Sequence, residues 1–318
     1  MTRVICGVDF SSLSLDVSLG PEGVSCSFPN TPAGVADLIV FCQEHAVSLV
    51  AMEATGGYEQ PVVAALQGMG LAAAVLNPRE VRQFAESMGR LEKTDQIDAR
   101  MIAWFASVRK VRVARPVRAE QAELRALVTR LGQLTRESVT QRNQLRQSSM
   151  PRVQESIREL LALIARQIKQ LAAEVAELLA ADPVWSRLDR ALREIKGIAD
   201  RSVALLMAEL PELGTLSAKA VSKLAGLAPM ARDSGQHQGR RRVRGGRAEV
   251  RSLLYLVARG VAIYEPEFSQ FQERLKKAGK PPKVVRIALA HKLLVRLNAK
   301  ARDARRELAQ LDHQLAHA

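Results

Sequence analysis

The sequence predicts an α/β domain on a mixed sheet, then long helices, then a mainly helical C-terminal domain. Three observations predict this order. Short runs of β-type residues alternate with helical patterns up to about residue 110. Leucines recur at helical spacing between 119 and 180, and shorter helical patterns follow Asp182-Pro183. We therefore divide the chain into residues 1–112, 113–182 and 183–318.

The first domain opens with three expected strands joined by short turns, which is typical of an antiparallel meander. Thr31 is the expected N-cap of the helix that follows. In chain order we expect strands at Val4–Asp9, Leu15–Leu19 and Val24–Phe28, a helix at Ala33–His45, a strand at Ser48–Glu53, a helix at Glu59–Gly68, a strand at Leu71–Leu76, and helices at Glu80–Met88 and about Thr94–Val108. This βββαβαβα order with a mixed sheet is the ribonuclease H-like pattern, because a doubly wound parallel sheet would not open with hairpins.

The middle region predicts two long helices separated at Pro151. Their leucine pattern fits an antiparallel hairpin within the chain and a coiled coil between subunits equally well. In the last domain, the segment LREIKGIADRSVALLMAEL predicts two helices about Gly197, as in a helix-hairpin-helix motif that binds DNA phosphate. Ala199 stands where that motif usually has a second glycine, so simple helix packing is the alternative.

The charge of the chain is strongly uneven. The net charge is +14, which indicates a polyanionic partner, most simply nucleic acid. Residues 1–110 hold 8 Lys and Arg against 12 Asp and Glu, net −4, and the remainder holds 39 against 21, net +18. Bound cations would explain an acidic front half, and chance variation between domains is the alternative. Aromatic residues are only 4%, which argues against a base-stacking sheet as the main binding device.

The cysteines and the hydropathy pattern indicate where in the cell the protein is expected to be. Cys6, Cys26 and Cys42 have no metal-ligand spacing, and their odd number argues against a disulfide framework. Cys6 lies in an apolar run and is expected to be a small core residue. The start of the chain has no signal-peptide pattern, and no apolar stretch reaches a membrane-spanning ~20 residues. We expect a cytoplasmic protein without a membrane partner.

Four acidic residues form the candidate metal site. Asp9 ends the first expected strand, and Glu53 ends a strand that can lie beside it. Carboxyl ends of neighbouring strands face one crevice in sheets of this type. Asp95 and Asp98 lie three apart on an expected helix, so both project from one face. Four carboxylates in one pocket would repel one another, and Mg²⁺ or Mn²⁺ would remove that repulsion.

Each acid also has an ordinary structural explanation. Asp9 could cap a turn, Glu53 could pair with an arginine, and Asp95 or Asp98 could lie on a solvated helix face. Their joint pattern favours the metal site. Two ions ~4 Å apart can activate a nucleophile and stabilise the leaving oxygen of a phosphodiester.

Long segments of the chain resemble a known family. The segments are GVDFSSLSLDV, AMEATGGYEQPV, LNPREVRQFAESMGRLEKTDQIDARMIAWF and LAGLAPMARDSGQHQGRRRVRGGRAEVRSLLYLVA. They resemble the DEDD-type insertion-sequence transposases, which include bridge-RNA-guided recombinases and Piv DNA invertases. The resemblance covers nearly the whole chain in order, and the pairing of E-A-T-G-x-Y with K-T-D-x-x-D-A-R is highly specific.

The resemblance implies a RuvC-like N-terminal domain, a helical linker and a C-terminal transposase domain. Its metal-binding acids fall on Asp9, Glu53, Asp95 and Asp98, and its serine nucleophile falls on Ser234 of R-D-S-G. In such enzymes the serine forms a covalent phosphoserine link to DNA, assisted by the metal site, often that of a neighbouring subunit. The implied partners are donor and target DNA, a bridge or guide RNA, and further copies of the chain as a dimer or tetramer.

Basic residues near these motifs are candidates for nucleic-acid binding. Guanidinium groups clamp phosphates bidentately, and interleaved glycines let the backbone approach DNA closely. The alternative is an ordinary solvated charge run. The candidates are Lys93, Arg232, Arg240, Arg241, Arg242, Arg244, Arg247 and Arg251.

Three functions remain open on the sequence. The first is a transposase or site-specific recombinase with a covalent serine intermediate. The second is a metal-dependent nuclease or junction resolvase, or a Piv-like invertase that needs no guide RNA. The third is a non-catalytic nucleic-acid-binding protein whose acids have become structural. The absence of a G-x-x-x-x-G-K-[ST] motif agrees with the first, since serine chemistry conserves phosphodiester energy without ATP.

Overall fold

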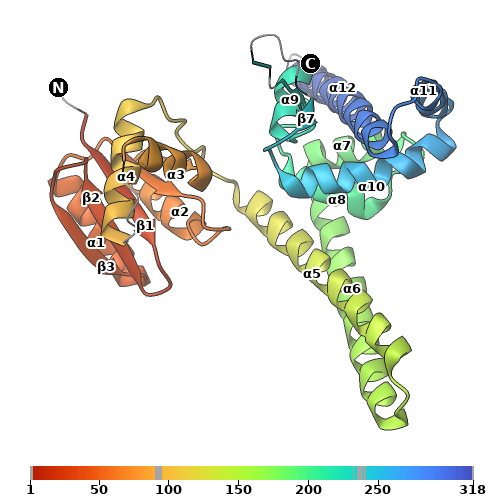
Figure 1. Ribbon diagram of the computed structural model, residues 1–318, viewed down its shortest axis with the longest axis horizontal. Coiled ribbons are helices and arrows are strands. Elements are labelled where there is room, and N and C mark those ends of the chain that lie inside the picture. The colour runs from red at the N-terminus through yellow and green to blue at the C-terminus, as the bar shows by residue number, and fades with distance from the viewer. Residues whose placement is uncertain (1–2, 90–94, 232, 235–238, 240, 317–318) are drawn as a thin grey trace. The chain divides into compact units, whose positions relative to one another are not determined.

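The computed structural model divides the chain into two compact units, Met1–Val117 and Arg118–Ala318 (Figure 1). It describes residues 3–89, 95–231, 233–234, 239 and 241–316. The first unit is a mixed α/β unit and the second is mainly helical. Lys93, Arg232 and Arg240 lie outside the described residues, as does the side chain of Asp95.

A five-stranded sheet in the order β3-β2-β1-β4-β5 forms the centre of the first unit. The first three strands pair antiparallel, and β4 joins β1 and β5 in parallel, so the predicted mixed sheet is confirmed. The strands are β1 Ile5–Phe10, β2 Ser14–Leu19, β3 Ser25–Pro29, β4 Leu49–Glu53 and β5 Ala73–Leu76.

Helices cover both faces of this sheet. One face packs on α1 and α2 through a core that includes the fully buried Cys6. The other packs on α3 and α4, through Met101, Ile102 and Phe105 of α4 (Figure 1). Thr31 caps α1 as predicted, because its hydroxyl accepts a hydrogen bond from Gly34 N at 3.2 Å. The helices are α1 Pro32–Glu44, α2 Gln60–Gly68, α3 Pro78–Ser87 and α4 Asp95–Val108.

The second unit begins with two long helices, α5 Ala119–Gln147 and α6 Pro151–Ala181, which pack along one another as a hairpin (Figure 1). Pro151 begins α6, where its fixed φ suits the first helical turn. Near the body of the unit the hairpin is well buried, through Leu124 and Leu131 among others. Toward its far end, apolar side chains are left exposed: Val139, Met150, Val153, Leu160 and Leu163.

The remaining helices share one core with the base of that hairpin. They are α7 Pro183–Arg193, α8 Asp200–Glu209, α9 Ala218–Leu224, α10 Ala248–Tyr264, α11 Pro266–Lys277 and α12 Pro282–Ala316. A short hairpin of β6 Pro229–Met230 and β7 Arg242–Val243 lies between α9 and α10. Across the described part of the chain, every helix is too short or too polar to cross a membrane.

Candidate active site

The sheet places Asp9 and Glu53 at neighbouring strand ends. The parallel register pairs Ile5 with Leu49 through to Val8 with Met52, so the next residue on each strand is Asp9 and Glu53. Side chains alternate along a strand, and Ile5 and Leu49 belong to the core under α4. Asp9 and Glu53 therefore lie on the α4 face, and both are half-buried.

Gly7 brings α4 onto this face of the sheet. A Cβ at Gly7 would lie 2.2 Å from Ala99 O and 2.5 Å from Ala103 N, so only glycine permits this approach. Ile5, nearer the start of β1, shares a core with the later residues of α4. The first turn of α4, which holds Asp98, therefore lies toward the Asp9 end of the strand. Three of the four predicted acids are thus brought to one end of the sheet.

Asp16 is an acid that sequence reasoning missed. It lies directly opposite Asp9 in the antiparallel register of β1 and β2. Its side chain is 8% exposed, and one carboxylate oxygen accepts a hydrogen bond from Ser14 Oγ at 3.0 Å. Like charges on directly opposed positions destabilise a sheet, and a bound cation would relieve this repulsion. The hairpin register of GVDFSSLSLDV carried the signal, because a turn at residues 11–13 sets position 9 against 16.

The donor set suits a hard divalent ion, because it consists of carboxylates. Among the described side chains, no three His, Cys, Asp or Glu are arranged to hold a metal ion. Asp95, the fourth predicted ligand, begins α4, but its side chain is outside that description. Asp9, Glu53 and Asp98 each make an interaction within the fold.

Glu59 shapes the loop that follows Glu53. Its side chain is buried, and Oε2 accepts hydrogen bonds from Thr55 N, Thr55 Oγ1 and Gly57 N at 2.9–3.0 Å. Burial alone would raise the pKa of Glu59, but the hydrogen bond from Gln60 and those from the backbone together lower it below the usual value. The ionised carboxylate therefore holds the E-A-T-G-G turn immediately after a predicted ligand.

Ser234 lies in the segment that connects β6 to β7. The two strands pair antiparallel through Pro229 with Val243 and Met230 with Arg242. The side chain of Ser234 is exposed. Next to it, Asp233 Oδ1 accepts hydrogen bonds from Arg241 Nη1 at 2.5 Å and Gly239 N at 3.1 Å. The Arg241 guanidinium lowers the pKa of Asp233 below its usual value.

The base of this hairpin is fixed by backbone contact between two glycines. Gly246 has φ +66°, and a Cβ there would lie 2.2 Å from Gly226 N. A Cβ at Gly226, with φ +67°, would lie 2.1 Å from Gly245 O. Arg247 N donates to Leu224 O at 2.8 Å in the same place. The segment that carries Ser234 therefore starts and ends at one rigid point.

Three of the predicted nucleic-acid-binding arginines are engaged within the fold, and Arg241, paired with Asp233, is the first. Arg247 makes a bidentate pair with Glu212, at 2.6 and 2.7 Å, and also donates to Glu209 O at 2.8 Å. Arg251 Nη1 donates to Gly245 O at 2.5 Å. Arg242 and Arg244 precede Arg247 and Arg251 in the chain, and neither forms an ion pair among the described residues.

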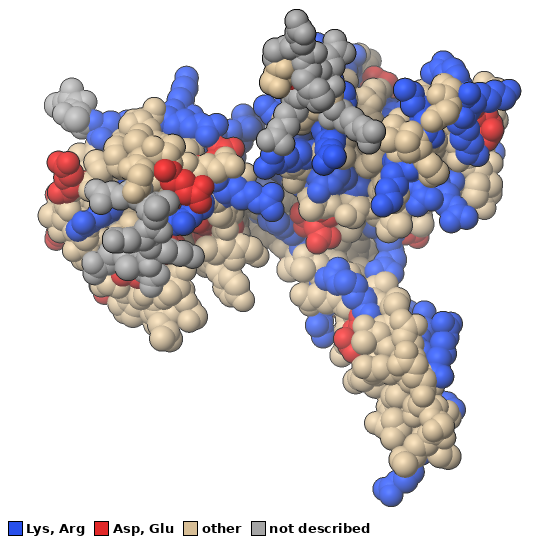
Figure 2. Space-filling view, in the orientation of Figure 1, with Lys and Arg blue, Asp and Glu red and all other residues tan. Residues whose placement is uncertain are grey.

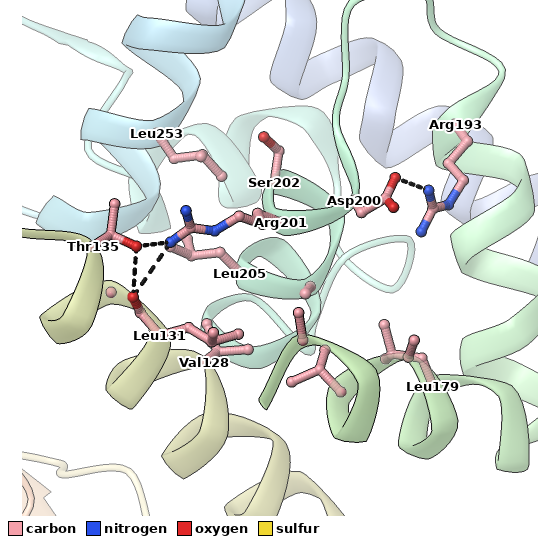
Figure 3. Close-up of a pocket in the computed structure, with 15 residues that line it drawn as sticks. Val128, Leu131, Thr135, Leu179, Arg193, Asp200, Arg201, Ser202, Leu205 and Leu253 are labelled. Carbon is pink, nitrogen blue, oxygen red and sulfur yellow. Dashed lines mark hydrogen bonds and ion pairs between the residues drawn. The ribbon is translucent and has the colours of Figure 1, made fainter. Parts of the chain in front are cut away.

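The segment about Gly197 forms two helices, α7 and α8, as predicted. Gly197 has φ +96°, and a Cβ there would lie 2.9 Å from Val261 N, so this glycine is required by close packing on α10. A cavity of about 370 Å³ lies between α5, α6 and α8 (Figure 3). Its walls are mostly apolar, and Arg201 is bound there to Thr135. Of the charged side chains that line it, Arg193 and Asp200 also pair with each other.

Carboxylates at neighbouring strand ends, with a separate basic unit that exposes a serine among arginines, are features that fit a protein acting on DNA strands. Comparison with known families makes this specific. Residues 6–150 match a DEDD transposase model, and residues 189–273 match the transposase IS116/IS110/IS902 family. The chain belongs to this family of transposases, whose members cleave and rejoin DNA strands.

Two relatives match over most of the chain. They are pilin gene-inverting proteins of Moraxella bovis and Moraxella lacunata. Each is 25% identical over 304 residues, which cover 92% of this chain and 94% of the relative. The similarity therefore spans both units.

Proposed function

We propose that this transposase cuts and rejoins DNA through a covalent phosphoserine intermediate at Ser234. The observation that carries the proposal is the exposed serine on a segment whose two ends are fixed by glycine contacts and by the Arg247–Glu212 pair. An enzyme that must bring a nucleophile to a DNA strand needs a serine that is accessible and also held in place.

The reaction would proceed in two balanced steps. Ser234 Oγ attacks phosphorus, an Oγ–P bond forms, and the bond from phosphorus to the leaving deoxyribose oxygen breaks. The serine proton is lost and the leaving oxygen gains one. A hydroxyl of the recipient strand then attacks the phosphoserine, forms the new phosphodiester and releases the serine. Because each step exchanges one phosphoester for another, no ATP is consumed.

We propose that Asp9, Glu53, Asp95 and Asp98 hold Mg²⁺ or Mn²⁺ in a ribonuclease H-like, RuvC-like unit. The sheet order β3-β2-β1-β4-β5 and the acids at neighbouring strand ends support this assignment. The buried Asp16 adds negative charge opposite Asp9. When bound, such an ion would lower the cost of deprotonating a nucleophile and stabilise the leaving oxygen.

The basic candidates divide into three groups in this proposal. Arg242 and Arg244 would contact DNA phosphates directly, as would Lys93, Arg232 and Arg240 from their places in the motifs. Arg241, within the serine segment, and Arg251, which binds Gly245 O, would contact DNA beside the serine. Arg247 would act first on the segment itself, because both terminal nitrogens of its guanidinium already bind Glu212.

Two partners complete the proposal. A guide RNA would share the basic second unit with DNA, since the chain beyond residue 110 carries a net +18. Further copies of the chain would pack on the α5–α6 hairpin, whose far end leaves apolar side chains such as Val153 and Leu160 exposed. Light scattering of a variant with a shortened hairpin tests this. Sequencing of copurified nucleic acid, after RNase and DNase controls, tests whether the protein binds a guide RNA.

The covalent step is tested by trapping. Ser234→Ala should abolish the protein–DNA adduct seen on a denaturing gel. Asp9→Asn should lower adduct formation in Mg²⁺ by about 100-fold or more, in keeping with the loss of a metal ligand. Full strand cleavage by Ser234→Ala would instead support a metal-dependent nuclease or resolvase. Unchanged nucleic-acid binding, with no cleavage by the wild type in Mg²⁺, would support a non-catalytic binding protein.

A second candidate is an invertase that works without a guide RNA. The similarity to two pilin gene-inverting proteins favours it. Strand exchange by protein freed of RNA would distinguish this candidate from a guided recombinase.

A further inference from the structure

A dense group of cations surrounds the turn between α11 and α12. Six basic side chains and a single acidic one, Glu273, lie between residues 273 and 286. The basic ones are Arg274, Lys276, Lys277, Lys280, Lys283 and Arg286. Figure 2 shows Lys and Arg gathered at the end of the unit that holds α11. No sequence motif drew attention to this segment.

Three lysines of the same helices pair with carboxylates within the fold. Lys276 Nζ lies 2.7 Å from Glu273, Lys292 Nζ lies 2.7 Å from Glu267, and Lys300 pairs with Glu194. Lys277, Lys280 and Lys283 are exposed and take part in no ion pair within the described parts of the chain. These three lysines are therefore available to an external anion.

Stability of the two helices does not explain all of this charge. Cations at the end of α11 favour its dipole, but those at the start of α12 oppose it, and the first turn of α12 has no acidic residue. Two guanidiniums are also oriented by aromatic rings. Arg274 lies 5.1 Å from the Phe271 ring centroid, and Arg286 lies 4.9 Å from that of Tyr255.

We propose that this α11–α12 basic surface, made of Arg274, Lys277, Lys280, Lys283 and Arg286, binds the phosphodiester backbone of nucleic acid. It is separate from the segment that carries Ser234, since α11 and β7, where that segment ends, lie at opposite ends of the body of the unit (Figure 1). Lysine ammonium groups act as point charges on phosphates and read no base pattern, so binding here is independent of sequence. The surface would hold nucleic acid away from the reacting phosphodiester. This inference rests on the proposed function only for the class of partner.

The test compares two matched triple variants by the salt dependence of affinity. Lys277→Gln/Lys280→Gln/Lys283→Gln removes three available cations, and Lys276→Gln/Lys292→Gln/Lys300→Gln removes three paired ones with the same change in net charge. The probes are a DNA duplex without transposon ends and an RNA hairpin of similar length. Loss of three phosphate contacts should make the slope of log Kd against log salt concentration shallower by about 2.7 for a DNA duplex.

The first triple variant should show this change with at least one probe, and the probe that responds identifies the nucleic acid. The second should leave both slopes unchanged. Equal changes in the two variants, or unchanged slopes in the first, would overturn the inference. The adduct assay is separate. If the first triple variant leaves the salt slopes unchanged while the wild type forms the Ser234 adduct, only this surface is refuted. If the variant changes a salt slope but the wild type forms no adduct, only the serine mechanism is refuted.

Discussion

The two candidate catalytic regions are positioned by different kinds of structure. Asp9, Glu53 and Asp98 occupy the ends of regular elements, so strand register and one helix contact fix them. Ser234 lies on an irregular segment that depends on contacts at its base, between glycines and through Arg247. The acid site should therefore tolerate changes around it that leave the sheet intact. The serine segment should be sensitive to changes at residues that never touch DNA.

The largest expected effect comes from adding a methyl group at the glycine contacts. Gly246→Ala would set a Cβ 2.2 Å from Gly226 N at a positive φ, so we expect loss of the Ser234 adduct and destabilisation by about 3 kcal/mol. Metal binding by the first unit should survive. Gly245→Ala is the matched control, because its φ is also positive but no atom lies within 4 Å of the added Cβ.

Gly7→Ala tests the other region in this comparison, the acid site. The added Cβ would overlap Ala99 O and push α4 from the sheet, which separates Asp98 from Asp9. Affinity for Mn²⁺, measured by calorimetry, should fall at least tenfold. Gly68→Ala, in α2 with open space around the added Cβ, should leave it unchanged. Normal Mn²⁺ affinity in a folded Gly7→Ala protein would contradict the placement of the acids.

The third prediction separates the positioning of the serine segment from direct phosphate contact. Arg247→Gln should slow adduct formation by about 10- to 100-fold, since a bidentate pair and a hydrogen bond at the base of the segment are lost. The salt slope of DNA binding should not change. Arg244→Gln should do the reverse and make the slope shallower by about 0.9.

Glu212→Gln provides the sharper control for Arg247. It removes a negative charge, which by simple attraction would strengthen DNA binding. It also weakens the same pair, so a positioning role predicts slower adduct formation despite the favourable charge. Faster adduct formation in this variant would contradict the role of the pair.

Much of the fold could be predicted from the sequence, because periodicity and turn residues are local signals. Every strand expected in the first domain is present, and so is the N-cap at Thr31. The neighbouring positions of Asp9 and Glu53 follow from strand order in the same way. The interface of α4 at Gly7 was not visible, since it depends on a backbone approach between distant segments.

The roles of individual arginines could not be predicted. Arg247 stands in a run that is typical of phosphate binding, yet its partner Glu212 lies 35 residues earlier in the chain. Sequence spacing cannot distinguish an arginine that a carboxylate already binds from one that faces solvent. Asp16 was missed for a related reason, because cross-strand register depends on where the turn falls. The metal ligands, the nucleophile and the three-part division of the chain stay predictions.

The smallest expected effect concerns pH and the loop after Glu53. The pKa of Glu59 is lower in the folded protein than in the unfolded chain, so its ionised form stabilises the fold. This contribution is present above the ordinary glutamate pKa of about 4.3 and is lost as pH falls through the lower, folded value. Glu59→Gln should reduce the free energy of unfolding by about 1–3 kcal/mol at neutral pH, as expected for hydrogen bonds to a charged acceptor.

The difference between Glu59→Gln and the wild type should shrink as the solution is acidified, because the wild-type carboxyl then becomes protonated as well. Chemical denaturation of the full chain at several pH values measures this difference. The two proteins share all other carboxyl groups, so the contributions of those groups cancel in the difference. Glu44→Gln, at an exposed position of α1, serves as the matched control and should give no such trend. The loop lies immediately after Glu53, so Mn²⁺ affinity should weaken only a few-fold. A difference in unfolding free energy that grows as pH falls would mean that Glu59 does not stabilise this turn as an ion.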